Sequence, residues 1–250
     1  MNHKVDDKNA MKRTQVVILA GGLGTRLRPI TETIPKPLVP VFDKPFLFWQ
    51  LLDLKAQGFT RILLLVAYLG QKIVDYFGDG SSLGLEIEYS FEPSPMGTGG
   101  ALKNAQDLLD DEFILINGDS FLQAPLVEMV KEFRDQNLEA LISTYDNRVP
   151  TPVIPNLITS EGLVRNYKKD AGLAEGFDLI DSGVYVIKKK VIERTQADHF
   201  ALADLWPDLV KQQKLGAFAV NERFYDIGTP ERLKEFEEKV RDHLAHTLSN

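Results

Sequence analysis

The chain contains no cysteine among its 250 residues. This absence excludes disulfide bonds, thiolate nucleophiles, iron–sulfur clusters and cysteine-based zinc sites. Long apolar runs are also missing, because the longest, Ile62 to Leu69, is far shorter than the roughly 20 residues of a membrane-spanning helix. Residues 1–13 are polar and lack the apolar core of a secretory signal. We therefore expect a cytoplasmic protein without a membrane partner, with a flexible tail over residues 1–13.

Basic residues are fewer than acidic residues. The chain has 29 Lys and Arg against 36 Asp and Glu, for a net charge of −7. Because clustered Lys and Arg provide the affinity for a phosphate backbone, this balance argues against nucleic acid as a partner, although it permits a local basic pocket. The remaining composition, with 44% hydrophobic and 26% charged residues, is typical of a globular protein.

Apolar strands alternate with helical segments in the first half of the chain. The strands expected at Val16 to Leu19, Arg61 to Ala67 and Phe113 to Ile116 are largely apolar, which is typical of a parallel sheet covered on both faces. Between the first two, Pro45 and Gly58 mark the start and end of a helix. The pattern predicts an α/β protein, a Rossmann-like three-layer sandwich with a mostly parallel central sheet. No linker interrupts residues 14–250, so we expect one domain there.

A glycine-rich loop follows the first expected strand. It reads Leu19-Ala20-Gly21-Gly22-Leu23-Gly24-Thr25-Arg26. Glycines allow backbone N–H groups to approach phosphate oxygens, and the Arg26 guanidinium offers a planar set of donors for a triphosphate. A dinucleotide fingerprint, as in an oxidoreductase, needs a third glycine where Leu27 stands, and a Walker motif is absent. The loop indicates phosphate binding; the alternative is a plain turn with a surface arginine.

Three further residues are candidates for phosphate chemistry. Lys36 lies between prolines that restrict the backbone around it. Asp119 follows a buried strand, at the sheet edge where ligands of open α/β proteins bind, and its carboxylate is suited to Mg²⁺. Asp226 is the second isolated carboxylate, and the sequence leaves open whether the two aspartates meet. An ordinary turn or helix cap is the alternative for each.

These motifs together resemble the nucleotidyltransferases that activate sugar 1-phosphates. The run LAGGLGTRLRPIT and the following PKPL resemble the family signature, and EPSPMGTGGAL, NGDS, SGVYV and YDIGTPE follow in the family's order. The resemblance covers about residues 14 to 240. Within the family, the short length and the segment from Gly97 to Ala101 are most similar to bacterial heptose 1-phosphate guanylyltransferases. We expect no C-terminal β-helix domain of the kind that longer relatives carry.

The resemblance implies the reaction of an NTP with a sugar 1-phosphate, giving an NDP-sugar and pyrophosphate. It assigns Arg26 to the β- and γ-phosphates, Lys36 to the α-phosphate and the sugar phosphate, and Asp119 and Asp226 to Mg²⁺. These four residues are the expected catalytic set. The loop residues expected to hold the nucleotide together with Arg26 and Asp119 are Leu19, Ala20, Gly21, Gly22, Gly24 and Thr25.

The segment that reads the base in this family corresponds to Glu92 through Gly97, with Thr98 next to it. Relatives specific for thymidylyl or uridylyl transfer commonly carry Gln at the position of Glu92. A carboxylate accepts the two N–H donors of guanine but repels the carbonyls of uracil and thymine. The resemblance therefore favours GTP, with UTP, dTTP or CTP as the alternatives. A second interpretation is that Glu92 only caps a turn before Pro93.

The sugar end departs from the family pattern. The residues expected there are Asn156, Lys168, Lys169, Glu175 and Asp181. Either lysine is a candidate for the sugar phosphate, and the two acidic residues for sugar hydroxyls. A heptose 1-phosphate is the favoured acceptor, and a hexose 1-phosphate or a related phosphate is the alternative. The favoured acceptor would place the enzyme in lipopolysaccharide or capsule synthesis. A non-catalytic nucleotide-binding regulator is the alternative of another class, and a homodimer is one option for the assembly.

Overall fold

The computed structural model describes residues 13–147, 151–169 and 171–248. Of the expected tail, only Arg13 lies within the described residues. The strands are β1 (Gln15–Leu19), β2 (Pro40–Val41), β3 (Lys44–Pro45), β4 (Arg61–Val66), β5 (Glu86–Phe91), β6 (Glu112–Asn117), β7 (Ser120–Phe121), β8 (Ala140–Tyr145), β9 (Leu157–Ser160), β10 (Leu163–Tyr167), β11 (Ile180–Lys188), β12 (Leu215–Ala219) and β13 (Tyr225–Asp226). The α-helices are α2 (Phe46–Gln57), α3 (Gly70–Phe77), α4 (Gly97–Asn104), α5 (Leu126–Asp135), α6 (Lys190–Glu193), α7 (Trp206–Lys211) and α8 (Pro230–Leu248).

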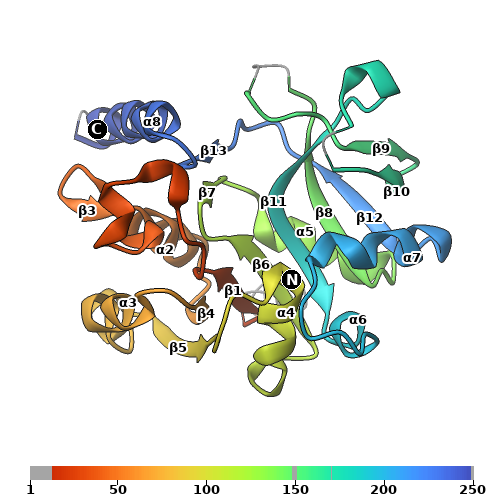
Figure 1. Ribbon diagram of the computed structural model, residues 1–250. Helices are drawn as coiled ribbons and strands as arrows, with labels where there is room; N and C mark the ends of the chain where they lie inside the picture. Colours follow the sequence, from red (N-terminus) through yellow and green to blue (C-terminus); the bar gives the residue numbers. More distant parts are fainter. Residues whose placement is uncertain (1–12, 148–150, 170, 249–250) are drawn as a thin grey trace, which may run out of the picture.

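A nine-stranded mixed sheet in the order β5-β4-β1-β6-β11-β8-β12-β10-β9 forms the centre of the molecule (Figure 1). Strands β5, β4, β1 and β6 are parallel, and Val17 of β1 pairs with Leu63 of β4 on one side and Leu115 of β6 on the other. Antiparallel β11 then separates β6 from β8, with which β12 pairs in parallel. The parallel half contains the strands predicted from their apolar runs.

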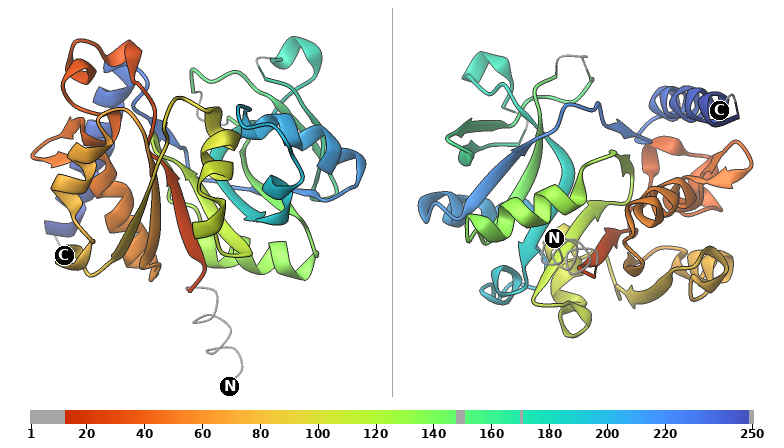
Figure 2. Two further views of the ribbon diagram at one scale, coloured as in Figure 1. Left: turned by 60° about the horizontal axis from the view of Figure 1, so that its bottom comes forward. Right: turned by 180° about the vertical axis from the view of Figure 1, so that it is seen from behind.

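Helices cover both faces of the sheet and complete the three predicted layers (Figure 2). Side chains alternate along each strand, so Val16 and Ile18 of β1 belong to one apolar core and Val17 belongs to the other. The first core includes apolar residues of α2, α3 and α5. The second includes residues of α4, α6 and α7. The α/β three-layer prediction is therefore confirmed.

The last helix, α8, follows the site region in the chain and packs against α2. The Thr229 hydroxyl accepts a bond from the Arg232 N–H at 3.4 Å, so Thr229 caps the start of α8. Phe236 of α8 packs on Phe46 of α2 with ring centroids 5.0 Å apart, in a third core that also holds Ile227. None of the helices within the described ranges is long and apolar enough to cross a membrane.

Glu139, which precedes β8, joins the sheet to α6. Its side chain is 9% exposed; its Oε1 accepts a bond from Arg194 Nη2 at 2.9 Å and lies 2.7 Å from Lys190 Nζ. The bond from Arg194 is the main reason that the pKa of Glu139 falls to about 2. This carboxylate therefore stabilises the fold above its unfolded pKa of 4.5, and the contribution is lost as the pH falls through about 2.

We expect Glu139→Gln to lower the free energy of unfolding by about 2 kcal/mol at neutral pH, the typical size for a hydrogen bond to a charged group. The difference from the parent protein should shrink as the pH falls from about 5 toward 2, because the parent carboxylate is then protonated. Urea unfolding at several pH values measures it. Glu193→Gln, an exposed neighbour on α6, is the control. A difference that stays constant with pH would show that the ion pairs do not account for the stabilisation.

Candidate active site

The candidate site lies in the parallel half of the sheet, at the point where the chain changes from adding strands on one side of β1 to adding them on the other side. The chain leaves β1 toward β4 on one side, whereas β6 lies on the other side of β1. The loops that follow β1 and β6 therefore diverge at the carboxyl ends of these strands, which is where ligands bind in open α/β sheets. A cavity of about 490 Å³ occupies this position.

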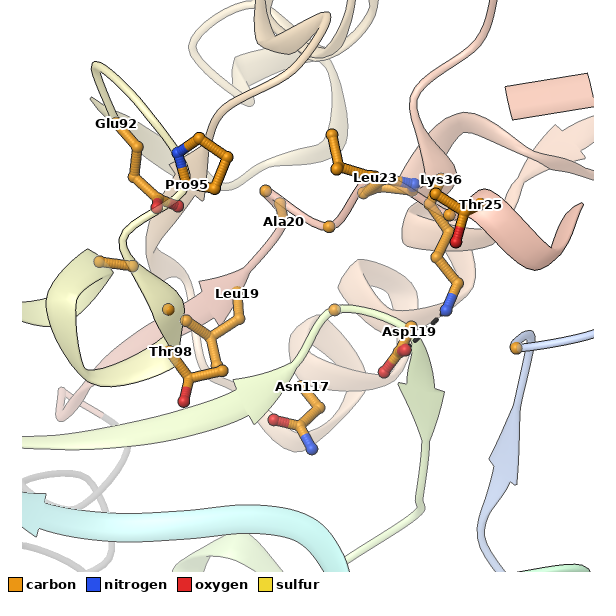
Figure 3. Close-up of a pocket in the computed structure, with 18 of the residues that line it drawn as sticks. Leu19, Ala20, Leu23, Thr25, Lys36, Glu92, Pro95, Thr98, Asn117 and Asp119 are labelled. Carbon is orange, nitrogen blue, oxygen red and sulfur yellow. Dashed lines mark hydrogen bonds and ion pairs between the residues drawn. The ribbon is translucent and has the colours of Figure 1, made fainter. Parts of the chain in front are cut away.

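Loops from distant parts of the sequence line this cavity. The lining residues are Leu19, Ala20, Gly21, Gly22, Leu23, Gly24, Thr25, Arg26, Lys36, Pro37, Glu92, Pro95, Gly97, Thr98, Ala101, Asn117, Gly118, Asp119 and Gly228. They include every residue expected to contact the nucleotide, together with Lys36. Figure 3 shows Glu92 and Pro95 at one end of the cavity and Lys36 with Asp119 at the other.

Two glycines shape the loops that follow β1 and β6. Gly24 has φ +61°, a left-handed conformation that favours glycine, and its carbonyl accepts a bond from the Thr31 hydroxyl at 2.7 Å. At Gly118 a Cβ atom would lie only 2.2 Å from the Leu19 carbonyl oxygen. The Gly118 N–H instead donates to that oxygen at 3.1 Å. The loop after β6 is therefore joined to the end of β1 by a backbone bond, which the absence of a Cβ atom at Gly118 permits.

Glu92 is half-buried and its carboxylate faces two elements. Oε2 accepts a bond from the Met96 N–H at 3.3 Å, which caps the turn before α4. Oε1 faces Gly21, where an added Cβ would lie 2.7 Å away. Burial raises the pKa of Glu92 above its usual value. The turn cap anticipated as an alternative is thus present, and the other oxygen is directed at the glycine-rich loop.

Gly97 lines the cavity, but a contact outside the cavity requires its conformation. The sequence suggests that a glycine here lets the backbone approach a base. In the structure Gly97 has φ +77°, and a Cβ there would lie 2.5 Å from the Phe200 carbonyl oxygen. The same carbonyl accepts the N–H groups of Gly99 and Gly100. These glycines therefore dock α4 against the segment around Phe200.

The two cations of the cavity differ in their partners. Lys36 is buried, and its Nζ lies 2.6 Å from Asp119 Oδ2, an ion pair that joins residues 83 positions apart. Arg26 lines the same cavity, but its guanidinium forms no ion pair within the described part of the chain. Arg26 is therefore available to an anionic ligand, whereas Lys36 holds Asp119 in place.

Asp226 lies beside Asp119 in the backbone but not at the cavity surface. Its strand β13 pairs with β7, and the Ile227 N–H donates to the Asp119 carbonyl at 3.0 Å. The carboxylate accepts bonds from Arg232 Nη1 at 3.0 and 3.1 Å and from the Gly228 N–H at 2.7 Å. The structure thus brings the two aspartate backbones together, and each carboxylate is neutralised by its own cation.

These two carboxylates suit a divalent cation that takes its other ligands from a substrate. Across the described ranges, no group of three or more His, Asp or Glu side chains forms a metal cage. Mg²⁺ is typically held by one or two carboxylates, substrate phosphates and water. The donor types of Asp119 and Asp226 fit that arrangement, and these two residues would hold the cation.

The residues expected at the sugar end form a separate cluster around β9, β10 and β11. Lys168 pairs with Glu175, and the Asn156 Oδ1 accepts the Asp181 N–H at 2.9 Å. None of these four residues lines the large cavity, and neither does Lys169.

Asp181 connects this cluster to the cavity. Burial raises its pKa to about 6, and its carboxylate accepts bonds from the hydroxyls of Tyr185 at 2.9 Å and Tyr167 at 3.3 Å. Asn117, which lines the cavity, is among the side chains that influence the pKa of Tyr185.

The sequence interpretation missed several residues of the site. Asn117, Gly118 and Gly228 line the cavity and lie inside motifs that were recognised, so adjacency to Asp119 and Asp226 was an available signal. Arg232 had no signal, since a cation in the first turn of a surface helix is usually solvated. Gln50 contacts the Asp119 loop from α2, and its only signal is a polar residue on an otherwise apolar helix face.

Comparison with known proteins agrees with this geometry. The family model described as "Nucleotidyl transferase" matches residues 15–243. The chain is 33% identical to the D-glycero-alpha-D-manno-heptose 1-phosphate guanylyltransferase of Campylobacter jejuni, over 89% of this chain and 98% of the relative. It is 31% identical to the UTP–glucose-1-phosphate uridylyltransferase of Synechocystis, over 94% of this chain but only 65% of that protein.

A solved structure is similar to this chain in both fold and sequence. The crystal structure of HddC from Yersinia pseudotuberculosis in complex with GMP-PN superposes with a TM-score of 0.74 and 33% identity, covering 91% of this chain and 99% of that chain. The match of sequence, fold and cavity-lining motifs extends over most of the described chain. The chain therefore belongs to the nucleotidyl transferase family.

Proposed function

We propose that this nucleotidyltransferase transfers a guanylyl group from GTP to a sugar 1-phosphate in the presence of Mg²⁺, with a heptose 1-phosphate as the preferred acceptor. The observation that carries the proposal is the composition of the large cavity. It combines a glycine-rich loop, the Arg26 guanidinium, the Lys36–Asp119 pair and the Glu92 carboxylate. A non-catalytic regulator has no need of this combination.

The reaction is a displacement at the α-phosphorus of the nucleotide. An oxygen of the sugar phosphate forms the new bond to phosphorus, the bond from phosphorus to the α,β-bridging oxygen breaks, and pyrophosphate leaves. The nucleophile needs no protein base, because a phosphate monoester has its second pKa near about 6 and is largely dianionic at neutral pH. The protein has to align two anions and neutralise their charge.

The charged side chains of the cavity supply that neutralisation. Arg26 would bind the β- and γ-phosphates and the departing pyrophosphate, and Lys36 would bridge the α-phosphate and the sugar phosphate. Asp119 and Asp226 would hold Mg²⁺, which supplies positive charge at the phosphates when bound. Within a chain of net charge −7, Arg26 and Lys36 are the basic side chains that line the cavity.

Guanine is favoured by the position of Glu92. Its Oε1 faces the glycine-rich loop at the end of the cavity away from Lys36 (Figure 3), where a carboxylate accepts the two N–H donors of guanine. The GMP-PN complex of HddC is consistent with this choice. The similarity to the Synechocystis uridylyltransferase keeps UTP as the second candidate.

A heptose 1-phosphate is favoured as acceptor by the relative that the chain matches almost end to end, the Campylobacter heptose 1-phosphate guanylyltransferase. Glu175 and Asp181 are candidates for sugar hydroxyls, and Lys168 or Lys169 for the sugar phosphate. Because Lys168 already pairs with Glu175, the acceptor would bind by exchanging partners in this cluster.

Release of pyrophosphate tests the proposal. GTP, UTP, dTTP and CTP are each combined with heptose, mannose, glucose and hexosamine 1-phosphates and with phosphocholine, in the presence of Mg²⁺. We expect release with GTP and heptose 1-phosphate. Release confined to another pair would reassign the substrates. No release with any pair, while calorimetry shows NTP binding, would contradict the proposed reaction and favour a regulator.

We expect Glu92→Gln to lower kcat/KM for GTP relative to UTP and dTTP by about 10- to 100-fold. A hydrogen bond to a charged group contributes about 1.5–3 kcal/mol, and the amide presents a donor where guanine also presents donors. Competition assays with mixed nucleotides measure the ratio. Glu88→Gln, with the same charge change on an exposed residue of β5, is the control. An unchanged ratio in Glu92→Gln would show that Glu92 caps the turn but does not select the base.

A further inference from the structure

Gln50 is a buried polar residue on the core face of α2. It is 4% exposed and lies between Leu47, Leu51 and Leu54, which are all buried. A polar side chain placed in an apolar helix face loses its contacts with water, so it has to be bonded inside the protein. The partners of Gln50 therefore indicate why the amide is there.

The amide nitrogen of Gln50 bonds both sides of the loop that carries Asp119. Nε2 donates to the Asn117 carbonyl at 3.0 Å and to the Ser120 carbonyl at 2.6 Å. These two carbonyls bracket Gly118 and Asp119 in the chain. Since both partners are acceptors, the amide has to present its nitrogen to them. One side chain thus uses its two N–H donors to hold the turn at the base of the cavity.

The remaining bonds of this turn connect it to the other parts of the site. The Gly118 N–H donates to the carbonyl of Leu19, at the end of the glycine-rich loop. The Asp119 carbonyl accepts the Ile227 N–H, next to Asp226. The segment that Gln50 holds is therefore the common support of Asp119, the glycine-rich loop and the Asp226 strand.

The oxygen of Gln50 plays no part in this support. Oε1 has no hydrogen-bond partner among the described residues. Gln50 also lines a cavity of about 10 Å³, together with Asp53, Ser120 and apolar side chains. That volume is about the size of one water molecule. The contacts that distinguish Gln50 from a plain packing residue are thus the two bonds of its nitrogen.

We propose that Gln50 is a positioning residue for the candidate metal site: its amide sets the place of Asp119, and through the Asp119–Ile227 bond that of Asp226. The inference rests on the proposed function, because it assigns Gln50 to the same Mg²⁺-dependent reaction. Side chains that support a metal ligand without touching the metal typically contribute 10- to 100-fold to metal affinity or activity. Gln50 itself touches neither substrate nor metal.

The test compares Gln50→Met with Gln57→Met. Gln57 lies on the same helix and also makes two bonds, to Asp53 Oδ2 at 2.8 Å and from the Leu126 N–H at 3.3 Å, but it does not contact residues 117–120. For Gln50→Met we expect the Mg²⁺ concentration at half-maximal rate to rise, and kcat to fall, by about 10-fold or more. Calorimetry should show that GTP binding without Mg²⁺ is retained and that the gain from Mg²⁺ is reduced. Gln57→Met should change neither.

A second variant covers the case in which Gln50→Met does not fold. Gln50→Glu has nearly the same size; its protonated form offers one donor and its ionised form offers none. The loss of activity relative to the parent protein should therefore grow as the pH rises. Parallel pH profiles, or a Gln50→Met protein with a lower Tm but the Mg²⁺ dependence of the parent, would overturn the assignment. Failure of the proposed reaction would instead appear in the parent protein, and the calorimetric comparison would still test Gln50.

Discussion

Replacing Asp119 with asparagine should lower kcat by about 10³-fold while the protein stays folded. The change keeps the size of the side chain but removes the charge that faces Lys36 at 2.6 Å. Charged groups and metal ions placed at a reacting phosphate act in a partly dry site, and the loss of one such interaction typically costs about 10²–10³-fold. Asp226→Asn should also strongly lower turnover, because Asp226 is the second proposed ligand of Mg²⁺. Its backbone is linked to that of Asp119 through Ile227.

Pyrophosphate release at increasing Mg²⁺ concentration measures this effect, and thermal unfolding confirms the fold. Asp110→Asn is the matched control, because Asp110 forms an exposed ion pair with Arg61 at 2.7 Å outside the cavity. Rates close to those of the parent protein in both Asp119→Asn and Asp226→Asn would remove the metal assignment.

Replacing Arg26 with methionine should also lower kcat by about 10³-fold. Arginines that neutralise the charge on transferring phosphates contribute about 10³–10⁵-fold in related chemistry, and the guanidinium of Arg26 has no ion pair within the described residues to compete for it. Arg26→Lys should recover part of the rate, because it keeps the charge but loses the planar pair of donors.

The comparison of kcat and KM separates this role from ground-state binding. An interaction made mainly with the departing pyrophosphate lowers kcat, whereas one made equally with bound NTP raises KM alone. Arg28→Met, an exposed neighbour that does not line the cavity, is the control. If Arg26→Met raised KM and left kcat unchanged, Arg26 would be a binding residue and not a catalytic one.

The local motifs could be interpreted from the sequence because their residues are close together in the chain. The loop from Leu19 to Arg26 follows an apolar strand, and its glycines specify a turn against the sheet edge wherever the strand is placed. The same holds for Asn117 to Asp119. Both segments follow parallel strands, and ligands bind at the carboxyl ends of such strands. This rule agrees with the position of the two segments in one cavity.

The mixed half of the sheet was harder to predict. The order of β11, β8, β12, β10 and β9 depends on pairings between strands that are far apart in the chain. Such pairings leave no periodicity in any one strand. The cluster around Asp181 lies in this half, and its tyrosine partners Tyr167 and Tyr185 could not be identified without the register.

The sequence by itself determined the fold class, the glycine-rich loop and the family, because short-range patterns of glycine, proline and apolar residues encode them. Only the tertiary structure decided the partners of the polar and charged groups: Lys36 with Asp119, Arg232 with Asp226, and the Gln50 amide with the Asp119 turn. These contacts are set by strand order and by the packing of α2 and α8 on the sheet. Their energies depend on distance and burial, and neither quantity is encoded by a residue's position in the chain.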